Sequence, residues 1–132
     1  MNDPTALVRR LYRAQLRGET QAVLELLAEN VTWNEPDGTP WEGLYVGQKA
    51  VAAVIDQVDA DWRNWVERDE VYLAGGDTVV VRGTCYGTYR ATGLTMETKF
   101  VDVWVVKQGK VQKVERTLES EPIAEAMGLF AA

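Results

Sequence analysis

The segment GDTVVVRGTCYGT, residues 76–88, decides the fold class of this chain of 132 residues. Its side chains alternate, so that Val79 and Val81 share one face of an extended strand. A second segment, FVDVWVVKQGKV at residues 100–111, continues the apolar pattern into a hairpin turn. The predicted long strands span residues 62–73, 78–89, 95–106 and 111–118. Because they follow one another through short turns, we expect an antiparallel sheet.

The residues before this sheet are predicted to be mostly helical. Asp3 is a good N-cap, and the proline after it is favoured at a first helical position. Two further helices are predicted to begin near Thr20 and Gly47, where apolar residues recur at helical spacing. Residues 31–35 are predicted as a short strand, and residues 39–47 as a loop.

A short helix is predicted to begin at Glu121. Helices gathered before consecutive antiparallel strands indicate the α+β class. The chain has no repeat, linker or low-complexity segment, so residues 1–132 are predicted to form a single domain.

The amino-acid composition argues against a nucleic-acid partner and against a membrane partner. Acidic residues outnumber basic ones by 20 to 14, which argues against a nucleic-acid partner. No apolar run approaches the roughly 20 residues of a spanning helix, and the first residues have no signal-peptide core. Cys85 is the one cysteine, which fits a reducing compartment. We therefore expect a soluble cytoplasmic protein with no membrane partner.

The chain has no histidine. This excludes nucleophiles activated by histidine and removes most zinc and non-haem iron sites. Acid–base chemistry would have to use Asp, Glu, Tyr, Lys or Cys. We expect no metal and no other cofactor.

Six segments in this order resemble the SnoaL-like family of the nuclear transport factor 2-like superfamily. They are LVRRLYRAQLRGE (7–19), AVLELLAENVTWNEP (22–36), LYVGQKAV (44–51), GDTVVVRGTCYGT (76–88), FVDVWVVKQGKV (100–111) and EPIAEAMG (121–128). The resemblance implies a cone in which a bent antiparallel sheet closes around three helices, with a short C-terminal helix and an internal pocket. It also implies a small-molecule ligand and a homodimer formed through the sheet. Relatives include ketosteroid isomerase, limonene epoxide hydrolase and polyketide cyclases.

The resemblance makes Glu35 the first candidate catalytic residue. It precedes a proline, as does the general base of ketosteroid isomerase, a well-known case of tuned acid–base catalysis. A carboxylate in such a pocket can have its pKa raised by burial and transfer a proton. Trp33 shares a face with Glu35, and Asn34 lies near the position of an asparagine in the epoxide hydrolases. Both are candidate substrate-binding residues, and a solvated carboxylate at a strand end is the alternative for Glu35.

Two more carboxylates are candidates for a second acid. Asp102 lies in an apolar strand, where an unpaired buried charge would be costly. It faces either the pocket or water, and an ion pair with Arg116 across the final hairpin would fit either a structural or a binding role. Glu119 aligns with a water-orienting aspartate of the epoxide hydrolases.

Three aromatic residues complete the candidate substrate-binding set. Tyr12 and Tyr86 could donate hydrogen bonds to a developing oxyanion, and Trp41 lies in the loop over the cone mouth. Each could equally be a packing residue.

The chain departs from the relatives at several catalytic positions. Their residues are replaced here by Leu11, Thr84, Val101 and Arg116. The first hypothesis is a cofactor-free acid–base enzyme of the isomerase, cyclase, dehydratase or hydrolase type, acting on a small, largely apolar molecule. The alternative is a non-catalytic binding or dimerisation module with the same fold.

Overall fold

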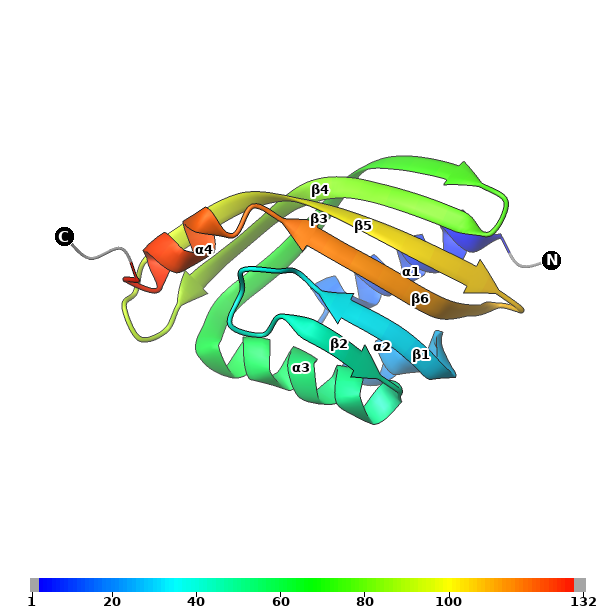
Figure 1. Ribbon diagram of the computed structural model, residues 1–132, viewed down its shortest axis with the longest axis horizontal. Coiled ribbons are helices and arrows are strands. Elements are labelled where there is room, and N and C mark those ends of the chain that lie inside the picture. The colour runs from blue at the N-terminus through cyan, green and yellow to red at the C-terminus, as the bar shows by residue number, and fades with distance from the viewer. Residues whose placement is uncertain (1–2, 130–132) are drawn as a thin grey trace.

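The computed structural model describes residues 3–129, which build a curved sheet of six strands in the order β2-β1-β6-β5-β4-β3 (Figure 1). The strands are β1 Leu27–Glu35, β2 Gly43–Val46, β3 Trp62–Gly75, β4 Thr78–Tyr89, β5 Thr95–Lys107 and β6 Lys110–Leu118. Neighbouring strands are antiparallel except for the parallel pair β1 and β6. Each strand of the final meander pairs with the next in sequence, as the short turns predict.

The first three helices, α1 Pro4–Leu16, α2 Thr20–Glu25 and α3 Gln48–Asp61, pack against the sheet and against one another. Helix α4, Glu121–Ala126, lies at one end of the sheet against β5 (Figure 1). Asp3 caps α1, because its Oδ1 accepts a hydrogen bond from the Thr5 amide at 3.0 Å. The α+β class and the cone-like arrangement are confirmed.

Two predicted boundaries were wrong. The predicted loop 39–47 contains β2, whose Tyr45 pairs with Trp33 of β1. Four residues between two turns are too short for alternation to reveal a strand. The first strand begins at Leu27 rather than at residue 31, because Leu27 pairs with Val111 of β6. That partner is distant in sequence and gives no local signal.

Strand β3 carries an irregularity near its start. Its pairing with β4 shifts between Arg63 and Val66, and Asn64 has a φ of 55°. Asparagine is one of the few residues other than glycine that adopts this left-handed region readily. The bulge re-aims the side chains that follow it, which include Trp65 and Glu67.

Aromatic side chains fill much of the interior. Trp33 packs edge to face on Trp104, with ring centroids 5.6 Å apart. A second group consists of Trp41, Trp62 and Trp65, whose ring centroids lie 5.4–6.5 Å apart.

In residues 3–129 no helix is long and apolar enough to cross a membrane.

Candidate functional site

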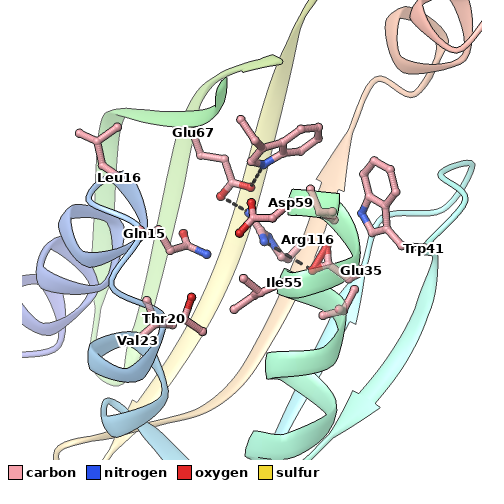
Figure 2. Close-up of a pocket in the computed structure, with 14 residues that line it drawn as sticks. Gln15, Leu16, Thr20, Val23, Glu35, Trp41, Ile55, Asp59, Glu67 and Arg116 are labelled. Atoms are coloured by element: carbon pink, nitrogen blue, oxygen red, sulfur yellow. Dashed lines mark hydrogen bonds and ion pairs between the residues drawn. The ribbon is translucent and has the colours of Figure 1, made fainter. Parts of the chain in front are cut away.

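Arg116 is the centre of the polar cluster inside the cone. It lies on β6 opposite Asp102 of β5, and its side chain is 8% exposed. Its guanidinium contacts three carboxylates, one from each of three other strands: Glu35, Glu67 and Asp102. Figure 2 shows Arg116 between Glu67 and Glu35. A planar group with five N–H donors suits this position, because it can face several acceptors at once.

Glu35 approaches Arg116 from the end of β1. The Arg116 Nη1 lies 3.5 Å from Glu35 Oε2, and the Trp33 indole Nε1 donates to the same oxygen at 2.5 Å. Strand alternation places these two side chains on one face, since they are two residues apart. Trp33 is fully buried and its ring lies 5.5 Å from the Arg116 guanidinium carbon. Glu35 is therefore held from behind by a residue that solvent cannot reach.

Glu67 approaches Arg116 from β3. Its Oε1 accepts from Arg116 Nη2, and its Oε2 accepts from Trp65 Nε1 at 3.0 Å. The spacing is again two residues, but Trp65 is only half-buried and lines the cavity. Glu67, like Glu35, thus accepts a hydrogen bond from an indole N–H, but its indole partner is more exposed.

Asp102 lies behind the guanidinium and is inaccessible to solvent. Arg116 Nε donates to its Oδ1 at 3.2 Å, and the Tyr12 hydroxyl donates to its Oδ2 at 2.5 Å. Trp104 Nε1 in turn donates to the Tyr12 hydroxyl oxygen at 3.0 Å. The predicted ion pair between Asp102 and Arg116 is present, and every oxygen of this buried carboxyl has a partner.

Burial dominates the electrostatics of the cluster. It raises the pKa of the Glu35 carboxyl, although Arg116 and the Trp33 indole oppose the rise. Burial also raises the pKa of Asp102 to about 6, against the opposing charge of Arg116. The pKa of Arg116 stays above its ordinary value, since Asp102, Glu67 and Glu35 outweigh the effect of burial. Although they lie beside a guanidinium, Glu35 and Asp102 thus retain protons more readily than isolated carboxyls do.

A cavity that opens to solvent lies next to the cluster. Its walls come from α1, α2, α3, β1, β3 and β6 and from the loop that carries Trp41 (Figure 2). The polar residues at its inner end are Glu35, Glu67 and Arg116, and most of the remaining lining is apolar or aromatic. Such a chamber, apolar with a few convergent polar groups, is typical of small-molecule sites.

The structure brings only part of the predicted site to this cavity. Glu35, Trp41 and Arg116 line it. Trp33 supports Glu35 from outside the cavity lining. Asp102 instead borders a smaller recess beside it that Glu35 and Arg116 share.

Four predicted residues lie elsewhere. Asn34 is exposed, because it alternates with the inward-facing residues on either side. Tyr86 is half-buried outside the cavity lining, with the Arg68 guanidinium 5.6 Å above its ring. Glu119 is exposed beyond the end of β6. Tyr12 is fully buried and donates its hydroxyl hydrogen to Asp102, so it does not line the cavity.

Sequence reasoning missed Glu67 and Trp65. A usable signal was present, because the Trp-x-Glu spacing occurs twice, at 33–35 and at 65–67. Alternation along a strand puts both members of such a pair on one face. The bulge at Asn64, which decides which face, leaves no comparable trace in the sequence.

Comparison with known proteins gives this architecture a family. The SnoaL-like domain matches residues 8–114. The chain belongs to the SnoaL-like family. No curated protein matches it in sequence.

Solved structures agree on the fold. An NTF2-like protein of unknown function from Burkholderia pseudomallei is 30% identical, with 100% of each chain covered and a TM-score of 0.86. One from Burkholderia thailandensis is 29% identical, with 96% of this chain and 98% of the other covered and a TM-score of 0.92. A candidate polyketide cyclase from Xanthomonas campestris is 26% identical. The match covers 86% of this chain and 88% of the other, with a TM-score of 0.79. The SnoaL-like fold of the NTF2-like superfamily is thereby confirmed.

The donor set suits proton transfer. The described residues contain no group of three histidine, cysteine or acidic side chains arranged to hold a metal ion. Cys85 borders the small recess, and burial raises the pKa of its thiol well above the usual range, which disfavours a thiolate nucleophile. A buried carboxyl facing the cavity is the group best placed to take or give a proton.

Proposed function

We propose that the chain is an acid–base enzyme that acts on a small, largely apolar molecule bound in the cavity. Glu35 is its proton-transferring group. The observation that carries the proposal is the position of Glu35: its side chain is 7% exposed, faces the cavity, and has a pKa raised by burial. A carboxyl tuned in this way works nearer to neutral pH than one in water.

Arg116 and Trp33 support this role by fixing the carboxyl. Trp33 holds one oxygen by its indole N–H, and Arg116 lies 3.5 Å from the same oxygen. The other oxygen of Glu35 has no hydrogen-bond contact of this kind among residues 3–129, so it is the one offered to a substrate. Isomerisation, cyclisation, dehydration and hydration all contain a step in which such an oxygen exchanges a proton with carbon or oxygen.

The name of the Xanthomonas campestris relative, a candidate polyketide cyclase, supports a carbonyl-bearing substrate for the same fold. Cyclisation of such a molecule begins with proton removal next to a carbonyl group. A cavity lined by Trp41, Trp65 and the apolar face of α3 would accommodate the hydrocarbon part.

The test is hydrogen–deuterium exchange next to a carbonyl. The protein is incubated in deuterated buffer with a panel of small cyclic enones and β-keto esters, and exchange is followed by NMR. For a compound that exchanges, Glu35→Gln should lower the rate by about 10²–10⁴-fold, the usual contribution of a general acid or base. Glu29→Gln, on the same strand but exposed, is the matched control and should leave the rate unchanged.

Full activity in Glu35→Gln would sink the assignment of this residue. A molecule that saturates the cavity and is recovered unchanged, with no exchange, would favour the non-catalytic binding module.

A further inference from the structure

We infer that the cavity takes an organic cation, a protonated amine carried on a small apolar or aromatic body. The inference rests on the proposed function, because it names the ligand class for that same cavity. Three independent features of the lining carry it: the charge balance, the direction of the hydrogen-bond donors, and the aromatic walls.

The charge balance of the cavity is negative. Glu35 and Glu67 line its inner end, the exposed Asp59 adds a third carboxyl to the lining, and Arg116 is the one cation in that lining. A fourth carboxylate, Asp102, lies directly behind the guanidinium. An excess of one sign in a place sheltered from water is costly unless protons or a counter-charge neutralise it. A ligand with a positive charge supplies that counter-charge, whereas an anion adds to the excess.

The strong hydrogen-bond donors of the site are directed at the protein's own carboxylates. Arg116 donates to Glu35, Glu67 and Asp102, and the indole N–H groups of Trp33 and Trp65 donate to Glu35 and Glu67. The charged groups left facing the cavity at its inner end are therefore the acceptor oxygens of Glu35 and Glu67.

An unfilled acceptor lies on the α1 side of the cavity. The Gln15 Oε1 is buried and has no hydrogen-bond partner within residues 3–129, and Gln15 lines the cavity (Figure 2). An ammonium group brings three donors and no acceptor, which matches this arrangement. A carboxylate ligand would place acceptors against acceptors.

The aromatic walls suit a cation with an apolar body. Trp41 and Trp65 both line the cavity, and their rings meet at 83° with centroids 5.5 Å apart. The face of an indole attracts a cation electrostatically. Val54, Ile55 and Val58 of α3 supply apolar contact for the rest of the molecule.

Three probes of nearly equal shape test the inference by isothermal titration calorimetry. They are 2-phenylethylammonium, 2-phenylethanol and phenylacetate. The ammonium should bind about tenfold or more tightly than the alcohol, the value of one charge-assisted hydrogen bond, and phenylacetate should bind weakest. Glu67→Gln should lower the preference for the ammonium over the alcohol by about tenfold. Glu70→Gln, on the same strand with its carboxylate at Thr84 and Lys99, should leave that preference unchanged.

The pH dependence gives a second readout. A bound cation favours ionised carboxyls, so ammonium binding should release protons and tighten as the pH rises from about 5 to about 7, while the alcohol should show no such gain. The groups that titrate are Glu35 and Asp102. The charged or titratable groups around them are Arg116, Glu67, Tyr12 and Tyr45, with Asp59, Asp56 and Arg90 near the opening.

Equal affinity for the ammonium and the alcohol would overturn the inference, as would tighter binding of phenylacetate or no binding of any probe at millimolar concentration. An unchanged preference in Glu67→Gln would also overturn it. The proposed function fails by a different result, full exchange activity in Glu35→Gln, so the two failures are distinguishable.

Discussion

The chain uses the Trp-x-Glu spacing twice, at Trp33–Glu35 on β1 and at Trp65–Glu67 on β3, and the two glutamates flank Arg116 (Figure 2). In both, an indole N–H donates to the carboxylate two residues later. Trp33 is fully buried, whereas Trp65 is half-buried and forms part of the cavity wall. Solvent cannot reach the indole of the first pair, whereas the indole of the second pair lines the cavity.

The difference in burial between Trp33 and Trp65 comes from the strands that carry them, since the hydrogen bond within each pair is the same. Trp33 and Glu35 lie in regular pairing with β6 and β2, while Trp65 follows the bulge at Asn64. A short local spacing therefore determines the hydrogen bond, and the surrounding sheet determines what the bonded pair faces. The same two residue types form a buried, closed pair in one place and part of the cavity wall in another.

The largest expected effect comes from removing the cation that both pairs share. Arg116→Gln leaves the buried carboxyls of Glu35 and Asp102, and the partly buried Glu67, without their counter-charge, so we expect the free energy of unfolding to fall by about 3–5 kcal/mol. Urea denaturation measures the change. Arg82→Gln, an exposed arginine on β4, is the control and should change stability by less than about 0.5 kcal/mol. Equal stability of the two variants would contradict the central role of Arg116.

The next largest effect depends on whether Asp102, rather than Glu35 or Glu67, carries a proton in the folded protein. Burial raises the pKa of Asp102 from 3.8 to about 6, so the protonated form is favoured by folding. Its stabilising contribution is full below about pH 4 and is lost as the pH rises through about 6. Relative to Asp102→Asn, the wild type should lose on the order of 2–3 kcal/mol of stability across that window. Urea titrations at several pH values measure this change. If the stability of wild type and of Asp102→Asn changed with pH in the same way, the proton would not reside on Asp102.

Phenylalanine substitutions compare the two indoles directly. Trp33→Phe removes a donor from a fully buried carboxylate contact and leaves space in the core, so we expect a loss of about 2 kcal/mol. Trp65→Phe should cost about 1 kcal/mol or less, since water can reach its site. Thermal unfolding of the two variants measures the order, and the reverse order would refute the distinction between a closed and an open pair.

The smallest expected effect comes from changing Asn64, the residue at the bulge in β3 that has no counterpart beside Trp33 in β1. Asn64→Val puts a β-branched side chain at a φ of 55° and should cost about 1 kcal/mol, whereas Asn64→Gly should be tolerated. Chemical denaturation of both variants, with NMR of the Trp65 indole proton, measures stability and local geometry. A tolerated valine would show that this backbone conformation does not position Trp65.

Much of the fold was predictable because its signals are local. Alternation and turn residues gave the four long strands, and Asp3 with its following proline gave the first helix. The parallel pairing of Leu27 with Val111 and the short strand β2 were not predictable in this way, since they depend on partners far along the chain.

The candidate site divides in the same manner. The Asp102–Arg116 pair was predictable, because the two residues face each other across a tight hairpin. Glu67 was not, since its contact with Arg116 depends on a bulge in β3 and on the curvature of the whole sheet. Glu119 was expected at the pocket but is exposed, because β6 ends at Leu118 and the chain then turns into α4.

The division of the tryptophans into two groups has an optical consequence. Trp33 and Trp104 are sealed in the core, whereas Trp41 and Trp65 touch the cavity and Trp62 touches both of them. Indoles this close exchange excitation energy, so light absorbed by any of the three can be emitted from a ring that borders the ligand. The protein therefore carries intrinsic fluorophores in the wall of its cavity, and their emission would respond to a molecule that enters it.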